Sequence, residues 1–376
     1  MHTRYMILLP LTFLILMLEN DSCVAQHSFQ IYAPSRSTQE LLVIGAQVDS
    51  RDSDSEDIEF TISARVPLGF AGATISRHPD KSVLYVAPSQ TQWDAGKSIT
   101  SGAIVRLDES GACSEIDSVI YKHGYAYMSV DRTGKFLLGS NYHDGQIDVY
   151  RLDGMGLIDE HVATVDEGRR NAHCILPSPD NRFLYVPYVK QTNALFQYTF
   201  NSGTGKVVAM KPKNVKPPAG TGPRHIAYHP SLPIVYFSNE QHVGVSVYDQ
   251  KPTGHLAFKQ LCDVVSKERS KEGLSASDIV ITQDAKFVYS AIRGRRQNFD
   301  RLAGYAVQSD GTLKFLELTA TEGIPWGMTL SPKGRYLLVS CFEGESLLAY
   351  EIAIDGCLKR VGRVELPRYI SDLVTY

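Results

Sequence analysis

The chain has 376 residues, a formal net charge of -3, 43% apolar residues and 20 tyrosines. A chain of this length is too long for one ordinary hydrophobic core unless it forms a barrel or an array of repeats. The slightly negative net charge argues against non-specific electrostatic binding of nucleic acid, which requires a basic surface. The many aromatic residues favour β-strands, because their side chains fit a pleated, half-buried surface.

The first residues have the pattern of an export signal. Arg4 supplies a fixed positive charge, and residues 6–18 form an almost unbroken apolar run. This run has the length of a signal-peptide core and is too short to cross a bilayer comfortably. We therefore expect residues 1–25 to be a signal peptide, cleaved after Ala25, and the mature chain to be periplasmic or secreted. An uncleaved anchor is the alternative. No lipobox precedes Cys23, and no later segment resembles a membrane span.

Residues 49–59, DSRDSDSEDIE, interrupt the pattern of the segments on either side. Their acidic and serine-rich composition predicts a solvated loop. A calcium site is the alternative, although the stretch lacks the glycine and the terminal glutamate of an EF-hand loop.

One phrase recurs along the rest of the chain, with apolar alternation, Pro-Asp or a relative of it, a basic residue and a β-rich run. Its six copies begin at Ile75, Met128, Cys174, Ile226, Ile279 and Met328. Their spacing of roughly 50 residues is typical of four-stranded propeller blades. A second phrase follows most copies, as in QIDVYRLDGMG and LAGYAVQSDGTL, and its Asp-Gly turn predicts a hairpin. Each repeat is therefore expected to contain two hairpins and four antiparallel strands.

The repeats predict an all-β, seven-bladed propeller that forms a single domain over residues 26–376. The seventh blade combines an N-terminal strand near residues 29–33 with the last strands near residues 369–376. This closure joins the chain ends within one sheet and removes an open edge. A six-bladed ring is the alternative. No long helical pattern supports a parallel α/β fold.

The cysteines do not form a recognisable framework. Cys23 leaves with the predicted signal, and the five that remain are scattered and odd in number. Neither a disulfide scaffold nor a CxxC zinc or redox motif is implied, so single buried thiols are expected. These are Cys113, Cys174, Cys262, Cys341 and Cys357. No metal and no cofactor are expected.

Four polar residues lie where predicted strands begin or end. His173 and Arg224 precede strands, whereas Glu240 and Arg293 end them. A carboxylate and an imidazole can move protons or activate water. Two guanidiniums can hold a substrate anion and stabilise an oxyanion. Opening a lactone requires water attack, oxyanion stabilisation and protonation of the leaving oxygen, and these groups can supply each of them without a metal.

Each candidate also has a structural interpretation. His173 can be a hydrogen-bonded structural histidine, and Arg224 with Glu240 can be an ion pair between neighbouring strands. Arg293 can belong to one solvated basic loop with the arginines that follow it.

Other motifs are weak or absent. The sequence contains no GxSxG elbow and no HExxH. Residues 220–222, GTG, resemble a phosphate loop only superficially, because Pro223 and no helix follow them. His225 and His229 alternate along a predicted strand and are interpreted as packing or surface groups.

The phrases GPRHIAYHP and SNE resemble the lactonase family of β-propellers. Its members include propeller-type 6-phosphogluconolactonases and fungal carboxy-cis,cis-muconate lactonizing enzymes. NAHCILPSPDNRFLYVPYVKQ and IVITQDAKFVYSAIRG support the resemblance, which runs from about residue 28 to the C-terminus. It implies a site of one histidine, two arginines and one glutamate. The matching positions here are His173, Arg224, Arg293 and Glu240.

Two positions depart from the family pattern. A later blade of the family often reads PRGF, whereas this chain has PWGM with Trp326 in place of the arginine. Ile292 replaces an asparagine before Arg293. If the family arginine helps to hold an anion, Trp326 argues against a phosphorylated substrate. The export signal also argues against a cytosolic sugar phosphate.

The leading hypothesis is a hydrolase of a small anionic lactone, either a sugar lactone or another. Glu240 or His173 acts as general base on water, and Arg224 and Arg293 bind the substrate anion and the oxyanion. A cycloisomerase acting on a muconate-like diacid can use the same residues. The third hypothesis is a non-catalytic exported propeller that binds envelope proteins, with Trp326 and the tyrosines as a recognition surface.

Overall fold

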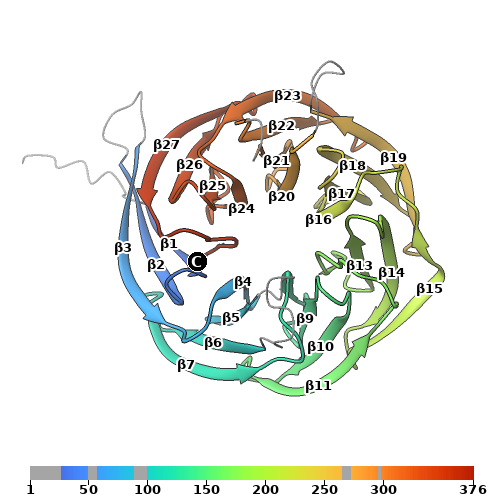
Figure 1. Cartoon of the computed structure of the whole chain (residues 1–376), viewed down its shortest axis with the longest axis horizontal. Coiled ribbons are helices and arrows are strands. Elements are labelled where there is room, and N and C mark those ends of the chain that lie inside the picture. Colours follow the sequence, from blue (N-terminus) through green and yellow to red (C-terminus); the bar gives the residue numbers. More distant parts are fainter. Residues whose placement is uncertain (1–26, 50–56, 89–99, 265–271, 295–297) are drawn as a thin grey trace, which may run out of the picture.

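The computed structural model of the chain describes residues 27–49, 57–88, 100–264, 272–294 and 298–376. Within them, seven sheets of four antiparallel strands stand around a ring as blades, and no helix occurs (Figure 1). The predicted seven-bladed propeller is confirmed, and the six-bladed alternative is wrong. Among the described residues, no helix has the length and apolarity needed to cross a membrane. The expected signal peptide, residues 1–25, lies outside the described part of the chain.

Blade 1 consists of β28 and β1–β3, and blades 2 to 7 take the following strands four at a time. The innermost strands are β28 (Val374–Thr375), β4 (Gly72–Arg77), β8 (Tyr127–Val130), β12 (Leu176–Pro177), β16 (Pro223–Tyr228), β20 (Ser275–Ile281) and β24 (Pro325–Leu330). The second strands are β1 (His27–Ser35), β5 (Val83–Pro88), β9 (Phe136–Ser140), β13 (Phe183–Tyr188), β17 (Ile234–Asn239), β21 (Phe287–Arg293) and β25 (Tyr336–Cys341). The third strands are β2 (Glu40–Asp49), β6 (Ser101–Leu107), β10 (Ile147–Leu152), β14 (Ala194–Asn201), β18 (Gly244–Gln250), β22 (Arg301–Val307) and β26 (Ser346–Ile352). The outermost strands are β3 (Asp57–Pro67), β7 (Cys113–Ile120), β11 (Ile158–Val165), β15 (Lys206–Val215), β19 (Leu256–Asp263), β23 (Leu313–Ala320) and β27 (Leu358–Glu365).

The hydrophobic core lies between the blades. β13, FLYVPY, is buried at every position, because its alternate side chains pack against the two neighbouring blades. The outermost strand β7, CSEIDSVI, alternates between exposed and partly buried residues, because one of its faces meets solvent. Burial between the blades leaves the inner ends of the sheets available for polar side chains.

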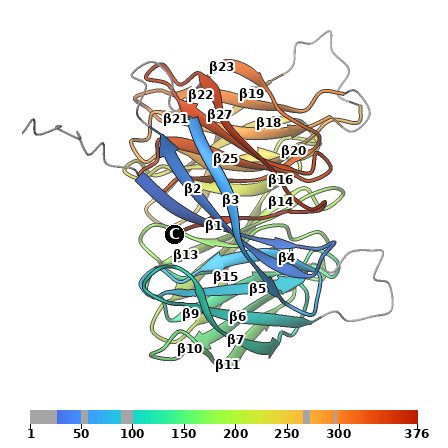
Figure 2. The ribbon, with the colours of Figure 1, turned by 90° about the vertical axis from the view of Figure 1, so that its left-hand side faces the viewer.

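The chain ends meet in blade 1. β28 pairs with β1, placing Thr375 opposite Ile31 and Val374 opposite Tyr32. This confirms the predicted closure. The C-terminal segment supplies only one strand of the blade, the innermost, whereas the sequence predicted more than one. Figure 2 shows β1, β2 and β3 of this blade side by side at the edge of the ring, with the C-terminus beside β1.

The acidic stretch contains less loop than the sequence predicts. Asp49 ends β2 and Asp57 begins β3, and these two residues face each other in the ladder. Ile58 is buried, while Asp57 and Glu59 are exposed, so these acidic residues occupy the solvent face of an outer strand. The expectation of a loop over all of residues 49–59 is therefore wrong at both ends, where Asp49 and residues 57–59 belong to strands. In β3, the buried Ile58 continues the alternation of buried and exposed side chains. Residues 50–56 lie outside the described part of the chain.

Tyrosines on the second strands of five blades, blades 1, 2, 4, 5 and 6, bind the blade that follows. The Tyr85 hydroxyl on β5 donates a hydrogen bond to the Gly156 carbonyl, 2.6 Å away, in the β10–β11 turn of the following blade. The same contact recurs in the pairs Tyr32–Gly111, Tyr185–Gly254, Tyr236–Gly311 and Tyr289–Gly356. A buried hydrogen bond of this kind contributes about 1 kcal/mol. These contacts give five of the 20 tyrosines a structural role.

A buried polar cluster fills part of blade 3. The fully buried Asp148 carboxylate on β10 lies 2.6 Å from His123 Nδ1, 2.8 Å from the Tyr125 hydroxyl and 3.1 Å from His161 Nε2. It also accepts a hydrogen bond from Thr164. Burial opposes ionisation of Asp148, but the hydrogen bonds from His123 and Thr164 hold the pKa of this carboxyl below its ordinary value. Asp148 in turn raises the pKa of His123. We call these five residues the Asp148 cluster.

All five cysteines of the described residues are free thiols. Cys174, Cys262 and Cys341 are buried, in agreement with the prediction. Cys113 is only partly buried and Cys357 is exposed, so the expectation of burial is wrong for these two. Cys357 lies in the exposed turn directly before β27.

Candidate functional site

The four predicted residues lie at the same end of three consecutive blades. His173 precedes β12 in blade 4, Arg224 is the second residue of β16 and Glu240 follows β17 in blade 5, and Arg293 ends β21 in blade 6. Because β16 and β17 are antiparallel, the beginning of one and the end of the other lie at one end of the blade. β20 and β21 are also antiparallel, and Ser275 at the beginning of β20 lies opposite Arg293 at the end of β21. Positions at the beginnings and the ends of strands therefore share one location.

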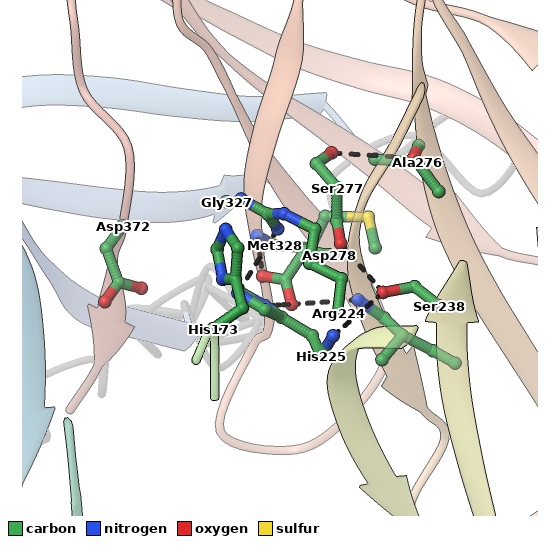
Figure 3. A network of polar contacts seen from close by, with 12 residues as sticks. His173, Arg224, His225, Ser238, Ala276, Ser277, Asp278, Gly327, Met328 and Asp372 are labelled. Atoms are coloured by element: carbon green, nitrogen blue, oxygen red, sulfur yellow. Dashed lines mark hydrogen bonds and ion pairs between the residues drawn. The ribbon is translucent and has the colours of Figure 1, made fainter. Parts of the chain in front are cut away.

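One carboxylate oxygen is the centre of the group. Glu240 Oε2 lies 3.2 Å from Arg224 Nε, 3.8 Å from Arg293 Nη2 and 3.9 Å from His173 Nε2. Figure 3 shows His173 and Arg224 close together within the polar network that His225 and Asp278 extend. Three basic side chains thus surround one acid, which is the arrangement needed to bind an anion and to activate water in the same place.

Burial separates the alternative interpretations of the arginines. Arg224 is 1% exposed and Arg293 is 5% exposed. The interpretation of Arg293 as part of a solvated loop is therefore wrong. The ion pair between Arg224 and Glu240 does exist, but both residues line a cavity instead of being packed inside a sheet.

A tight loop positions Glu240. Its backbone N–H donates to the Gly222 carbonyl at 2.7 Å, and the Gly222 N–H donates to Asn193 Oδ1 at 2.7 Å. Gly222 has a φ of +60°, and a Cβ there would lie 1.4 Å from Gln241 Oε1. Gly222 is therefore suited to this left-handed position, from which its carbonyl fixes the backbone of Glu240.

The imidazole of His173 is held in its neutral form. Burial lowers the pKa of His173 well below its ordinary value, and the positive charge of Arg224 lowers it further. A neutral imidazole can accept a proton, so His173 remains a candidate base beside Glu240.

Arg293 is held by a carbonyl and an aromatic ring. Its Nη2 donates to the Ala276 carbonyl at 2.9 Å, and its Cζ lies 4.5 Å from the centre of the Trp326 ring. Trp326 stacks on Phe342, with ring centres 4.4 Å apart. The position where the family often has an arginine is thus filled by an aromatic ring that supports another arginine through a cation–π contact.

These residues open into one cavity of about 720 Å³. Its described lining combines basic side chains, aromatic rings and two carboxyls. The lining side chains that bear on its chemistry are Arg36, Lys190, Arg224, Arg293, His173, His225, Glu240, Asp372, Tyr142, Trp326, Phe342 and Tyr369. This volume is within the range of small-molecule sites.

Asp372 is the second carboxyl of the lining. Its Oδ2 accepts hydrogen bonds from the Thr74 hydroxyl at 2.9 Å and from the Ile75 N–H at 3.0 Å. Burial raises the pKa of Asp372 to about 7, and the negative charge of Asp278 adds to this effect. The cavity therefore contains one acidic group that titrates near neutral pH.

His225 is a correction to the sequence interpretation. The residue is 8% exposed, lines the cavity and contacts the Arg224 guanidinium, so it is not a packing or surface group. A shift in the β16–β17 register between Pro223 and Ile226 turns two consecutive side chains toward the ring axis. Simple alternation along a strand cannot anticipate such a bulge. His229 fits the packing interpretation, because its Nδ1 accepts two backbone N–H groups of the following turn.

Several residues of the site were not singled out from the sequence. Tyr142 and Lys190 line the cavity, and Asp278 lies behind His225, which it contacts. All three belong to segments that look like ordinary blade phrases or loops. Asp278 offers one usable signal, because it occupies the same place in the blade 6 repeat as His225 in blade 5, directly before the repeat isoleucine.

Residues 45–370 match the family described as Lactonase, 7-bladed beta-propeller. The chain belongs to this lactonase propeller family. A 6-phosphogluconolactonase of Cronobacter sakazakii is 32% identical over 257 residues, which cover 67% of this chain and 74% of the relative. A 6-phosphogluconolactonase of Enterobacter sp. (strain 638) is 31% identical over 243 residues, covering 63% of this chain and 70% of that protein.

Among solved structures, this lactonase-family chain is similar to a periplasmic gluconolactonase of Pseudomonas aeruginosa. The TM-score is 0.79 at 21% sequence identity, and the match covers 93% of this chain and 99% of that one. At this level of identity the likeness establishes the common propeller fold.

Proposed function

We propose that the protein hydrolyses a small anionic lactone in the cavity around Glu240. The observation that carries this proposal is the convergence of His173, Arg224 and Arg293 on Glu240 Oε2, at distances of 3.2 to 3.9 Å. Membership of the lactonase family and the two relatives named 6-phosphogluconolactonase support it.

The reaction divides into two steps. Glu240, or alternatively the neutral His173, accepts a proton from water as the water oxygen bonds to the lactone carbonyl carbon. The carbonyl oxygen becomes an oxyanion, which the guanidiniums of Arg224 and Arg293 stabilise. The bond between the carbonyl carbon and the ring oxygen then breaks, and the ring oxygen takes up the proton held by the base. The product is the open hydroxy acid.

The substrate class follows from the charges of the lining. Arg36 and Lys190 add to the two central arginines, so the cavity attracts an anion. Trp326 offers an aromatic face instead of a third central guanidinium, which favours a lactone whose charge is a carboxylate over one with a phosphate.

The first test is hydrolysis of a panel of sugar lactones, with and without phosphate, by the chain from Gln26 onward and by its Arg224→Ala variant. Loss of an oxyanion-stabilising group is expected to lower kcat roughly 10²- to 10³-fold. A thermal unfolding curve of each protein checks that the variant is folded, and spontaneous lactone opening is subtracted. Equal rates at the background level would contradict hydrolysis and favour a binding platform. A turnover that takes no oxygen from labelled water would instead indicate cycloisomerisation.

We also propose that the mature chain is exported. The charged start and the apolar run of residues 6–18 support this, and a periplasmic gluconolactonase has the same fold. Expression of the full chain in a bacterial host is expected to yield a periplasmic or extracellular product that begins at Gln26, as measured by mass spectrometry. A product that keeps residues 1–25 in the cytosol would contradict the proposal.

A further inference from the structure

The orientation of Arg224 depends on a neighbour that faces the same cavity. The guanidinium presents Nε to Glu240 at 3.2 Å and Nη1 to His225 Nε2 at 3.2 Å. His225 Nδ1 in turn lies 2.7 Å from Asp278 Oδ1. We propose that His225 and Asp278 are positioning residues that hold the Arg224 guanidinium against Glu240. This inference rests on the lactone hydrolysis proposed above and adds the residues that orient its anion-binding arginine.

The donors and acceptors fit together in only one way. An ionised carboxylate can only accept, so Asp278 requires the proton of a neutral His225 ring to be on Nδ1. Nε2 is then a free acceptor, which is what the permanently protonated Arg224 needs. Burial lowers the pKa of His225, and the charge of Arg224 lowers it further, so the ring stays neutral. Burial opposes ionisation of Asp278, but His225 and two backbone N–H groups keep its pKa below the ordinary value.

Asp278 is itself fixed by the backbone. It accepts the Ile279 N–H at 2.8 Å and, across the gap between blades 6 and 7, the Met328 N–H at 2.8 Å. The Ser238 hydroxyl ties the two ends of the pair together, since it accepts the His225 N–H at 3.2 Å and donates to the Ser277 carbonyl at 2.9 Å (Figure 3). The pair is therefore built on two blades and can transmit a defined orientation to the guanidinium.

Asp372 makes the same kind of backbone contacts as Asp278, but its side-chain hydrogen bond comes from a threonine instead of a histidine. It accepts the Leu373 N–H at 2.9 Å and the Ile75 N–H of the next blade at 3.0 Å, as Asp278 does with its own neighbours. Its third partner is the Thr74 hydroxyl, which occupies the repeat position of His225. Both aspartates join adjacent blades, but only Asp278 is linked through a histidine to an arginine of the site. A purely structural role accounts for the shared contacts and not for this link.

The test is a double-mutant cycle on lactone hydrolysis with Asp278→Asn and Arg224→Lys. The asparagine has only one acceptor oxygen for the donors that Asp278 binds with two, and its N–H group donates a hydrogen bond to Nδ1 when it faces the ring. The ring proton is then on Nε2, where it points at Arg224. We expect Asp278→Asn to lower kcat roughly 10- to 100-fold with a smaller change in KM. If the pair acts through Arg224, adding Asp278→Asn to Arg224→Lys lowers kcat less than threefold further, on the order of the error of such a comparison. If the fold-losses in kcat of the two single variants multiply in the double variant, the two residues act independently and the proposal is wrong.

Thr74→Val is the matched control, because it removes the third hydrogen bond of the equivalent aspartate, Asp372, and leaves every contact of Arg224, His225 and Glu240 in place. Its kcat is expected to stay within about twofold of the wild type, since it leaves His225 and Arg224 in place. A loss as large as that of Asp278→Asn would show that weakening any aspartate that joins two blades impairs turnover. That result would count against a specific positioning role for Asp278.

A readout that needs no turnover separates this inference from the proposed function. Nitrogen-15 NMR is expected to show His225 neutral with its proton on Nδ1, and to show the Arg224 Nη1–H that contacts His225 Nε2 protected from exchange. Both features are expected to be lost in Asp278→Asn. A wild-type His225 with its proton on Nε2 would overturn the positioning pair. If no lactone is hydrolysed but both NMR features are present, the proposed reaction fails and the pair stands.

Discussion

Replacing Glu240 with glutamine is expected to lower kcat for lactone hydrolysis by roughly 10²- to 10⁴-fold, the range for removal of a general base. The amide has nearly the shape of the carboxylate but cannot accept the proton of the attacking water. It also removes the negative charge that Arg224, Arg293 and His173 share at 3.2 to 3.9 Å. Steady-state kinetics on the best lactone of the panel measures the effect.

Glu351→Gln serves as the control for this variant. Glu351 forms a surface pair with Arg335 at 2.8 Å, and neither residue lines the cavity, so the loss of this pair is expected to leave kcat unchanged. If Glu240→Gln keeps wild-type turnover, the carboxylate is not the base. A large loss in His173→Asn together with normal turnover in Glu240→Gln would assign that role to the histidine.

Replacing Asp148 with alanine is expected to lower the free energy of unfolding by about 3–5 kcal/mol, as for removal of one partner from a buried charged network. The carboxylate is fully buried and accepts from His123, Tyr125 and Thr164, which would lose their common acceptor. Denaturant unfolding followed by fluorescence measures the difference. Glu160→Ala, on the adjacent strand, removes only an exposed pair with Arg151 and is expected to cost less than about 1 kcal/mol.

The stabilisation by the Asp148 cluster should depend on pH in a defined direction. The pKa of His123 is raised, so its contribution is complete below about pH 6.5 and is lost as the pH rises through the folded pKa. The pKa of Asp148 is lowered, so its contribution is complete above about pH 4 and is lost as the pH falls through the folded pKa. The difference between wild type and Asp148→Ala should therefore be largest between about pH 4 and pH 6.5. A difference that is constant from pH 4 to pH 9 would contradict the assigned charges.

The repeat phrases were sufficient to predict the number of blades, the strands per blade and the closure of the ring. Each phrase carries a local signal, either alternating apolar residues or an Asp-Gly turn, and such signals do not depend on distant contacts. The stretch around Asp57 was misjudged because composition favoured a loop, whereas one buried side chain, Ile58, continues the ladder. Tertiary packing outweighed local preference at that point.

The residues that meet in the cavity were predicted individually, but their relative placement was not. His173, Arg224, Glu240 and Arg293 could be named because each is a polar residue at the end of an apolar run and matches a family motif. Their distances depend on how the three blades are arranged around the ring, which no local pattern contains.

The sequence by itself determined the all-β repeat architecture, the chain closure and the identities of the four central residues, because these follow from period, turn chemistry and motif. Only the tertiary structure decided that His225 and Asp278 belong to the site. A bulge in β16 turns Arg224 and His225 toward the same cavity, whereas alternation with a period of two assigns one of them to the opposite face. The ladder of β20 has a register shift at the equivalent place, around Asp278. The contact that gives them a role, from Asp278 through His225 to Arg224, spans two blades and exists only when the ring is assembled.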